Sequence, residues 1–211
     1  MLLISAILGV KMTGAIIVAP LVVVKKENIV YICRCMNEEK GILIRLERET
    51  DYPSVEHLVQ EAFLTAEHSD GKEHELVARL RGCSSFIPEL TLVLTVDGEI
   101  AGHIMFTEIS INGRKGHLAL APLSVTPQWQ RRHIGSALVK EGHNRARKLG
   151  YGLCVVLGDY RYYRRFGYRP AAEFGIVPPP GIDGRHYMAI ELNPAERFTS
   201  GIVKYAEPFG L

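Results

Sequence analysis

A loop that leads into a helix carries the residues best suited to chemistry in this chain. Arg131 and Arg132 stand where the loop meets the helix, and Gly135 and Ser136 follow in its first turn. Free backbone N–H groups and the positive end of the helix dipole favour an anion at such a place. Glycine lets a phosphate approach that backbone closely. The sequence therefore predicts a site for a phosphorylated small molecule, held by main chain and arginine together.

Positive charge gathers around this loop, although the chain as a whole is nearly neutral. The 25 Lys and Arg residues and the 23 Asp and Glu residues give a formal net charge of +2. Between residues 131 and 169, ten basic residues stand against two acidic ones, so this stretch carries +8 and the rest of the chain −6. A solvated helix face is the alternative explanation for Arg145, Arg147 and Lys148. The overall charge excludes a chain that binds nucleic acid along its whole surface.

Two further features lead to the same place. Pro122 interrupts what reads as a central strand, where proline cannot donate a ladder hydrogen bond. We expect a bulge or splay there that leaves backbone groups free for an extended ligand, unless the strand simply ends at Pro122. Tyr160, Tyr162 and Tyr163 come just after the next strand, and ligands of open α/β sheets bind at the carboxyl ends of such strands. Core and rim packing is the alternative role for Tyr160 and Tyr162.

Between residues 42 and 125, apolar and polar residues alternate as they do in the strands of an antiparallel sheet. A half-buried strand is expected over 42–49, followed by one helix that starts near Pro53 and a second that stops at Gly82. Further strands are expected over 91–96, 99–111 and 118–125. Asp-Gly at 97–98 and Asn-Gly at 112–113 join these strands, and both pairs suit type I′ turns. The expected product is a three-stranded meander.

The pattern changes after the meander. A helix capped by Gly150 leads into 153–158, a short apolar run typical of a parallel strand covered on both faces. Strand, crossover helix and parallel strand form one right-handed βαβ unit. A short aromatic helix over 160–166 and a late strand over 186–192 follow. We therefore expect an α/β (α+β) fold, with a mixed, mostly antiparallel sheet, a central βαβ unit and flanking helices.

Length, composition and cysteines narrow the class of protein. The 211 residues suffice for one domain that needs neither a disulfide nor a metal, and 47% hydrophobic with 23% charged residues excludes a disordered chain. Cys33 and Cys35 are too close to pair comfortably, Cys83 and Cys154 stand alone, and there is no C-x-x-C pair to indicate zinc. Reduced thiols in a cytoplasmic protein are the expectation.

The first 35 residues differ from the rest. Residues 1–26 are nearly all apolar, but Lys11 interrupts them, and an uncompensated lysine near the centre of a membrane span costs about 3 kcal/mol. We interpret 1–35 as an apolar extension that need not belong to the fold and 36–211 as the domain, with Met36 as a candidate start of the natural chain. A membrane anchor over 1–24 and an integral packed segment are the alternatives.

Two motifs, one βα unit apart, resemble the GNAT superfamily of acetyltransferases and more narrowly its YhbS-like members. The first, QRRHIG from Gln130 to Gly135, fills the register of Q/R-x-x-G-x-G/A. It departs from that pattern at His133, where glycine or alanine is usual. The second, YYRRFGY over 162–168, is similar to F-Y-x-x-x-G-F. The resemblance extends over about residues 42–211, and residues 1–35 have no counterpart in it.

The resemblance implies a reaction and a set of residues. The reaction is transfer of an acetyl group from acetyl-CoA to a primary amine by direct attack, with no metal. Tyr163 matches the position of the acid that serves the departing thiolate, since a tyrosine of pKa about 10 keeps its proton at neutral pH. The pantetheine arm and pyrophosphate are expected along the splayed strand and the loop, at Leu123, Ser124, Val125, Gln130, Arg131, Arg132, His133, Ile134, Gly135 and Ser136.

The acceptor and its base are less defined. The amine must lose a proton, and Glu108 is our candidate base, with His103, His117 or a backbone carbonyl with water as alternatives. A surface or rim position is the competing interpretation for each of these three side chains. The acceptor is expected to be a small molecule or a peptide rather than nucleic acid. The sequence is compatible with a homodimer. The alternative function is an acyl-CoA sensor of the same fold without catalysis.

Overall fold

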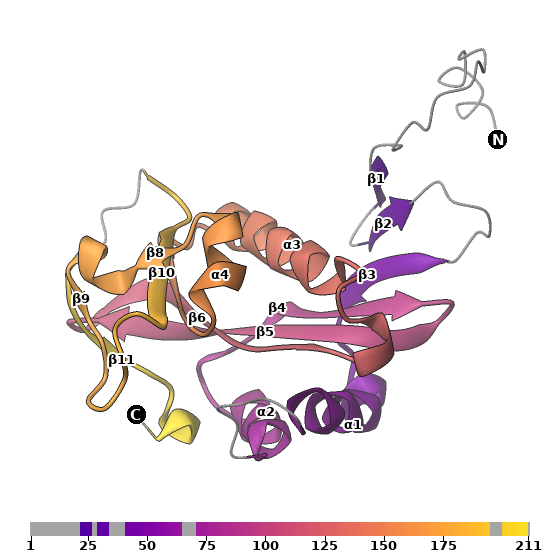
Figure 1. Ribbon diagram of the computed structural model, residues 1–211, viewed down its shortest axis with the longest axis horizontal. Helices are drawn as coiled ribbons and strands as arrows, with labels where there is room; N and C mark the ends of the chain where they lie inside the picture. The colour runs from indigo at the N-terminus through magenta and orange to yellow at the C-terminus, as the bar shows by residue number, and fades with distance from the viewer. Residues whose placement is uncertain (1–21, 27–28, 34–40, 65–70, 195–199, 211) are drawn as a thin grey trace, which may run out of the picture.

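The computed structural model describes residues 22–26, 29–33, 41–64, 71–194 and 200–210 (Figure 1). The helices in these ranges are α1 (Tyr52–Phe63), α2 (Glu73–Arg81), α3 (Ile134–Lys148) and α4 (Tyr160–Tyr163). The strands are β1 (Val22–Lys26), β2 (Ile29–Cys33), β3 (Ile42–Leu46), β4 (Phe86–Val96), β5 (Glu99–Ile111), β6 (Arg114–Val125), β7 (Leu153–Leu157), β8 (Arg169–Pro170), β9 (Ile176–Val177), β10 (Tyr187–Glu191) and β11 (Gly201–Lys204).

One sheet runs through the molecule in the order β1-β2-β3-β4-β5-β6-β7-β10-β8. Neighbours in this order are antiparallel except β6 and β7, which are parallel and joined by α3. The strand β11 pairs with the end of β5 and runs parallel to β9. The expected mixed, mostly antiparallel sheet with a central βαβ unit is therefore confirmed.

The meander forms as predicted because its turns have the required backbone. Asp97 and Gly98 have φ angles of 52° and 88°, and Asn112 and Gly113 have 48° and 79°. Type I′ turns need positive φ at both central residues, so both hairpins are confirmed. The first strand is longer than predicted and starts at Phe86. A register irregularity between Phe86 and Thr91 separates its first residues from the regular ladder.

The helices before the meander also follow the prediction. Pro53 lies at the start of α1, where its missing N–H costs no helical hydrogen bond. Val55, Leu58 and Val59 of α1 are buried, as are Val77 and Leu80 of α2. The cap of α2 is Gly82, the predicted stop.

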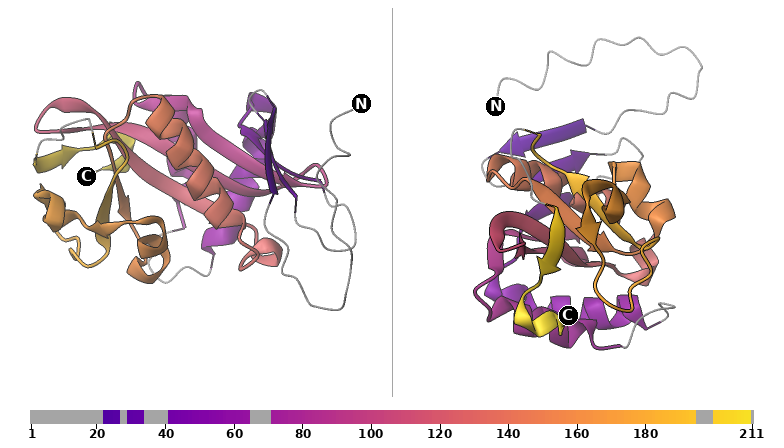
Figure 2. Two further views of the ribbon diagram at one scale, coloured as in Figure 1. Left: turned by 90° about the horizontal axis from the view of Figure 1, so that it is seen from above. Right: turned by 90° about the vertical axis from the view of Figure 1, so that its left-hand side faces the viewer.

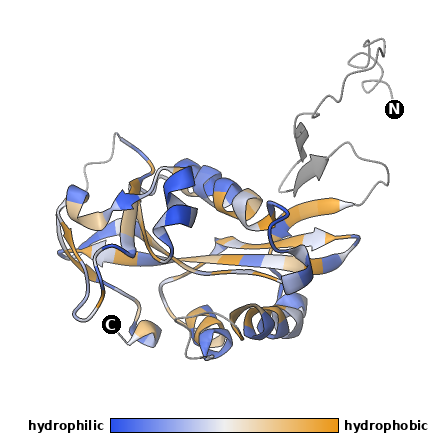
Figure 3. Cartoon of the chain, in the orientation of Figure 1, coloured by the Kyte–Doolittle hydropathy of each residue, from blue (hydrophilic) through white to orange (hydrophobic). Residues whose placement is uncertain are grey.

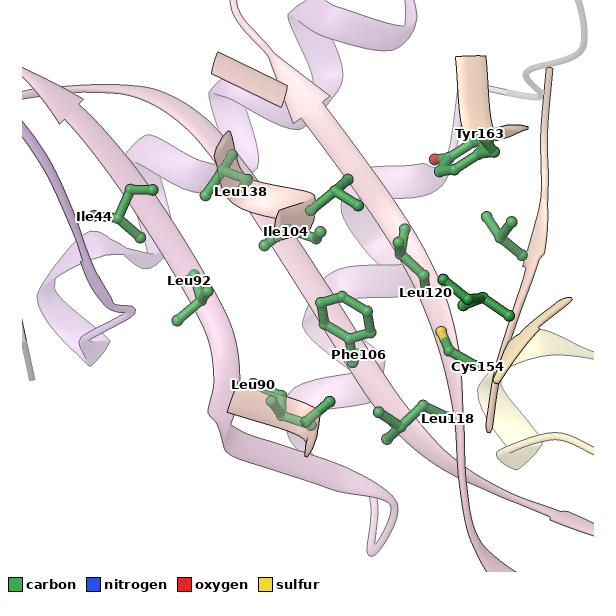
Figure 4. Packing of buried hydrophobic residues seen from close by; sticks show 14 of the residues in the cluster. Ile44, Leu90, Leu92, Ile104, Phe106, Leu118, Leu120, Leu138, Cys154 and Tyr163 are labelled. Atoms are coloured by element: carbon green, nitrogen blue, oxygen red, sulfur yellow. The ribbon is translucent and has the colours of Figure 1, made fainter. Parts of the chain in front are cut away.

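Two helical layers enclose the sheet, α3 and α4 on one face and α1 and α2 on the other (Figures 1 and 2). The core on the α3 side includes Ile104, Phe106, Leu138 and Tyr163 (Figure 4). The core on the α1 side is smaller and includes Met105 of the same strand, so β5 contributes alternate residues to the two cores. A Cβ at Gly102 would lie 2.8 Å from Ile134 Cγ2, so glycine allows α3 to approach β5 closely.

Part of the N-terminal segment lies at the edge of the sheet. The strand β2 pairs with β3 through Val30 opposite Ile44 and Tyr31 opposite Leu43, and β1 pairs with β2. Residues 1–21 and 34–40, with Lys11 and Met36, lie outside the described residues, so the division of the chain at 35/36 stays a prediction. None of the helices in the described ranges has the length and apolar character needed to cross a membrane.

Candidate active site

The strands β6 and β7 begin as a parallel pair and then part. Their pairing joins His117 to Leu153, Leu118 to Cys154 and Ala119 to Val155. On its other side β7 pairs with β10 along its whole length. Residues 120–125 of β6 and 156–157 of β7 therefore face each other without pairing within the described chain. We call this region the β6–β7 opening.

Pro122 produces the bulge that the sequence predicts. Leu120 lies opposite Phe106 and Leu123 opposite Ile104, so two residues of β6 face one residue of β5. Beyond the bulge, the Thr126 N–H donates to the Ala101 carbonyl. Hydrogen-bonded pairs alternate along an antiparallel ladder, so the main-chain groups of Ser124 point toward β5. Those of Leu123 and Val125 point away from β5, into the β6–β7 opening.

The loop after β6 turns this exposed backbone onto the start of α3. Gln130 donates from Nε2 to the Val125 carbonyl at 3.2 Å. Arg131 and His133 have φ angles of 59° and 66°, in the left-handed region. Turns of this kind direct successive N–H groups toward one point and bind anions. The exposed side chains of Arg131 and Arg132 lie at the same helix terminus.

The left-handed backbone explains the one departure from the family pattern. His133 is the N-cap of α3, and its φ of 66° is one that glycine adopts freely. Histidine is among the residues that tolerate this region, at a cost of about 1 kcal/mol or more. The histidine therefore keeps the turn that a glycine would form, and its side chain lies exposed at the surface.

Gly135 is required for a reason that the sequence did not indicate. A Cβ at this position would lie 2.5 Å from the hydroxyl of Tyr162, 3.5 Å from Val125 Cγ2 and 3.6 Å from Leu123 Cδ2. The sequence predicts that a phosphate approaches the backbone at this glycine, and that stays a prediction. In the structure the space above it holds the tip of a tyrosine from α4. A side chain at 135 would displace that hydroxyl.

The helix α4 places its tyrosines at three different depths. Tyr160 is 40% exposed, Tyr162 is half-buried and Tyr163 is 8% exposed. Although α4 is hydrophilic by sequence (Figure 3), Tyr163 packs into the core at the edge of the β6–β7 opening. In Figure 4 its hydroxyl points toward the strand that carries Leu120. Of the three, Tyr163 alone belongs to the buried core.

Tight packing holds Tyr163 in this position. A Cβ at Gly158 would lie 2.6 Å from its ring, and the rings of Tyr162 and Tyr168 are centred 5.1 and 5.5 Å away. Burial raises the pKa of Tyr163, and the neighbouring Tyr162 and Cys154 add to the rise. The phenol is therefore neutral over the whole range in which the protein would work.

The remaining arginines of the basic stretch serve the structure. Arg145 forms an ion pair with Glu141 at 2.9 Å, and Arg147 donates to the Leu192 carbonyl at 3.1 Å. Both belong to the end of α3 opposite the loop, where Arg147 and Lys148 are exposed, as a solvated helix face would have them, and Arg145 is partly buried. Arg165 lies over the ring of Tyr162, 4.3 Å from its centroid. Arg131 and Arg132 are exposed at the start of α3, and Arg165 places a further positive charge against Tyr162.

The candidate bases differ in burial: Glu108 is partly exposed, and the two histidines are buried. Glu108 of β5 lies opposite Leu118, and its carboxylate is 3.1 Å from Lys115 Nζ. His103 is fully buried, with Nε2 3.3 Å from the Glu47 carboxylate, and His117 is 3% exposed. The structure does not bring Glu108, His103 and Tyr163 together in one cluster. The role of Glu108 stays a prediction.

A buried ionic cluster under the α1–α2 face was missed by the sequence reading. Arg81 of α2 donates from Nη2 and Nε to both oxygens of Glu47, at 2.6 and 3.1 Å. The Arg81 guanidinium also lies 3.9 Å from the centroid of the Tyr52 ring. Burial alone would raise the pKa of Glu47, but hydrogen bonds from His103 and Arg81 hold it below its ordinary value. Glu47 is 34 positions from Arg81 and 56 from His103, so no local pattern marks this cluster.

Two grooves lie on the same side as this cluster. One, of about 450 Å³, is lined by residues including His57, Glu61, Glu99 and Thr126. Thr126 directly follows Val125, so this groove adjoins the end of β6. The other, of about 910 Å³, lies between the end of α2 and the C-terminal residues 206–210. The described residues contain no group of three or more His, Cys, Asp or Glu side chains arranged for a metal.

Comparison with known proteins agrees with this geometry. Residues 52–168 match the model of the acetyltransferase (GNAT) family. Over 171 residues the chain is 31% identical to the uncharacterized N-acetyltransferase YhbS of Escherichia coli K12, covering 80% of this chain and 98% of that protein. Over 145 residues it is 33% identical to YjhQ of the same organism, also an uncharacterized N-acetyltransferase, covering 65% of this chain and 80% of that protein.

Solved structures show the same fold. A GNAT family acetyltransferase from Brucella melitensis in complex with acetyl-CoA has a TM-score of 0.68 and 32% identity, over 80% of this chain and 98% of that one. YhbS from E. coli in complex with CoA has a TM-score of 0.74 and 28% identity, over 83% and 96%. The family match spans more than half of the sequence, and YhbS is aligned along nearly its whole length. This chain therefore belongs to the GNAT family of acetyltransferases.

Proposed function

We propose that the protein is an acetyl-CoA-dependent N-acetyltransferase, which moves the acetyl group to a primary amine on a small molecule or a peptide by direct attack. The β6–β7 opening carries this proposal, because its outward-facing backbone leads directly to the positive end of α3. Two solved relatives hold acetyl-CoA and CoA, which supports the same ligand here.

The residues around the opening fit the chemical parts of acetyl-CoA. The main-chain N–H and C=O groups of Leu123 and the N–H of Val125 suit the amides of a pantetheine arm in the way that a sheet edge suits an added strand, while the Val125 carbonyl accepts from Gln130. The N–H groups of residues 131–136 and the guanidinium groups of Arg131 and Arg132 suit a diphosphate. Gln130 and His133 shape the turn between these two parts.

Tyr163 is the proposed group that assists departure of the thiolate. Because burial raises its pKa, the hydroxyl keeps its proton at neutral pH. A thiol with a pKa of about 8.5 is a stronger acid than this phenol. Tyr163 therefore stabilises the sulfur chiefly by donating a hydrogen bond while negative charge develops there.

Glu108 is the proposed acceptor of the amine's proton. Its carboxylate is one of the few on the central strands, and it lies opposite Leu118, close to the point where β6 and β7 part. Its side chain is 24% exposed and its carboxylate lies 3.1 Å from the ammonium of the exposed Lys115, so an incoming amine would have to replace that lysine as its partner. Glu108→Gln is expected to lower turnover at neutral pH and to leave CoA affinity unchanged.

Binding and chemistry are tested separately. Calorimetric titration of the purified protein with CoA tests the binding site without any choice of acceptor. Release of free thiol from acetyl-CoA is then followed with polyamines, amino acids, aminoglycosides and peptides with free N-termini. No heat at millimolar CoA would overturn the proposal.

Replacing Tyr163 by Phe sharpens the assignment of the hydrogen-bond donor. We expect Tyr163→Phe to lower kcat about 100-fold, the lower range for loss of a general acid, and to change the Kd for acetyl-CoA less than twofold. Tyr160→Phe is the matched control, because Tyr160 lies on the same helix and is exposed. An unchanged kcat in Tyr163→Phe would remove Tyr163 from this role.

A non-catalytic acyl-CoA sensor is the second candidate function. It is favoured by the state of the candidate bases, since Glu108 is engaged by Lys115 and His103 is enclosed beside Glu47. A sensor would be stabilised thermally by CoA and would release no thiol with any amine. An enzyme would show both responses.

A further inference from the structure

Tyr162 connects the two parts of the proposed coenzyme site. It belongs to α4, yet its hydroxyl reaches the first turn of α3, where it lies close to the Ser136 side chain and beside Gly135. The point occupied by a Cβ at 135 would touch the Tyr162 hydroxyl, Val125 and Leu123 together. The hydroxyl is thus placed where the edge of β6 meets the helix terminus.

The aromatic ring is held firmly behind this hydroxyl. The Arg165 guanidinium covers the ring at 4.3 Å, and Arg165 Nε donates to the Tyr162 carbonyl at 3.0 Å. The rings of Tyr163 and Phe166 are centred 5.1 and 5.4 Å away. A phenol fixed in this way loses little conformational entropy when it binds a ligand.

The hydroxyl also has suitable chemistry for an anion. Burial raises the pKa of Tyr162, so the group is a neutral phenol that can donate. Beside it stand the Ser136 hydroxyl and the N–H groups of the first turn of α3. Hydrogen bonds to charged acceptors are about twice as strong as those between neutral groups.

We infer that Tyr162, together with Ser136, donates a hydrogen bond to the diphosphate of the bound coenzyme, and that Gly135 keeps the space for this hydroxyl. The inference rests on the proposed function, because it assumes that CoA binds at the β6–β7 opening. It adds a ligand-contacting residue from α4 to a site otherwise formed by β6, the loop and α3.

Calorimetry with CoA and with ADP tests the inference without an acceptor. ADP carries a diphosphate and no pantetheine arm. In Tyr162→Phe we expect the Kd for both ligands to rise by about 10-fold, the effect of losing one hydrogen bond to a charged group. Tyr160→Phe is the control on the same helix, and its Kd values should equal those of the wild type.

Three results would decide against the inference. If Tyr162→Phe binds CoA and ADP as the wild type does, the hydroxyl makes no contact with the coenzyme. If only the affinity for CoA falls, the contact is with the pantetheine arm rather than the diphosphate. If the wild type itself binds no CoA, the proposed function fails first, so the two failures are distinguishable.

A double-mutant cycle tests the pairing of Gly135 with the hydroxyl. Gly135→Ala places a methyl group where the Tyr162 hydroxyl lies, so we expect it to weaken CoA binding in the wild-type background by about 10-fold or more. In the Tyr162→Phe background the displaced oxygen is absent, and the same alanine should cost less than threefold. Equal costs in both backgrounds would show that Gly135 serves another purpose.

Discussion

The two faces of the sheet treat polar groups in opposite ways. On the α3–α4 face, burial keeps ionisable groups neutral: it lowers the pKa of His143 to about 4 and raises that of Cys154 to about 12. On the α1–α2 face, Glu47 and Arg81 are 3% and 9% exposed and remain an ion pair. The α3–α4 face contains neutral hydrogen-bonding groups beside an unpaired strand edge, and its Glu141–Arg145 ion pair lies within α3 itself. The α1–α2 face contains an ion pair that joins separate elements.

This difference separates the region that is suited to ligand binding from the region that stabilises the fold. The β6–β7 opening leaves main-chain groups of Leu123 and Val125 unpaired by β5, which is where a ligand can replace a strand. The ionic cluster instead uses its polar groups to hold elements together. It joins α2 to the end of β3 through Arg81 and Glu47 and contacts β5 through His103. A buried ion pair is costly to form and costly to break, so it fixes the position of α2 on the sheet. Changes on this face should therefore affect stability, and changes on the other should affect ligand binding and turnover.

Breaking the ionic cluster is expected to have the largest effect. Arg81→Ala removes the guanidinium partner of the buried Glu47 carboxylate and leaves it only His103, which should lower the free energy of unfolding by about 3–5 kcal/mol. Urea denaturation measures this change. The double variant Glu47→Leu, Arg81→Leu should recover much of the loss, because no buried charge then remains.

A surface ion pair provides the control for this prediction. Arg185 and Asp183 are 2.7 Å apart and highly exposed, so Arg185→Ala should leave the Tm unchanged. A loss below about 1 kcal/mol in Arg81→Ala would show that the cluster is unimportant for stability and would remove the contrast between the faces.

A fall in pH should destabilise the protein on the α3–α4 face, through His143. Burial lowers its folded pKa from 6.5 to about 4, so the unfolded chain binds more protons than the folded one between these values. The contribution of neutral His143 to the free energy of unfolding is therefore complete above pH 6.5. It is lost as the pH falls toward 4, by up to about 3 kcal/mol. Unfolding free energy measured at pH 7, 5.5 and 4 should show the decline.

His143→Gln separates this residue from the carboxylates. The pKa values of Glu47 and Asp51 are lowered, so their contribution is lost chiefly below their ordinary range. Between pH 6.5 and 4.5 the variant should lose clearly less stability than the wild type. Identical pH dependence in the two proteins would exclude His143 as the cause.

A single methyl group near Tyr163 is expected to have the smallest effect on folding and a clear effect on turnover. In Gly158→Ala the new Cβ would lie 2.6 Å from the Tyr163 ring and force it to move. We expect kcat to fall about 10-fold and stability by about 1–3 kcal/mol. Gly184→Ala is the matched control, because nothing lies within 4 Å of its Cβ. Equal activity of both variants would show that the position of Tyr163 is unimportant.

Local rules account for what could be predicted. Alternation, Asp-Gly and Asn-Gly turns and Pro122 each act over a few residues, and the strands, hairpins and bulge follow from them. The positive end of α3 likewise follows from Arg131, Arg132 and Gly135 in one short stretch. Strand β4 is the exception among the hairpins, since its irregular first residues have no such signal.

The missed features all join distant parts of the chain. Glu47 meets Arg81 and His103, and Asn112 donates to the Ser200 carbonyl, across separations of 34 to 88 residues. The neighbour of Gly135 is Tyr162, from the far side of the βαβ unit. Composition and periodicity contain no information on which side chains meet across such distances, because only the packed sheet and helices bring them together.

By itself, the amino-acid sequence determined the order of the main helices and strands from residue 42 onward and the bulge at Pro122, and it predicts an anion site at the start of α3. It could do so because backbone geometry and hydrophobic pattern are properties of neighbouring residues. Only the tertiary structure decided which tyrosine is buried, which hydroxyl reaches α3 and which charges are enclosed. Those outcomes depend on contacts between elements, since a side chain's depth and protonation are set by whatever packs around it.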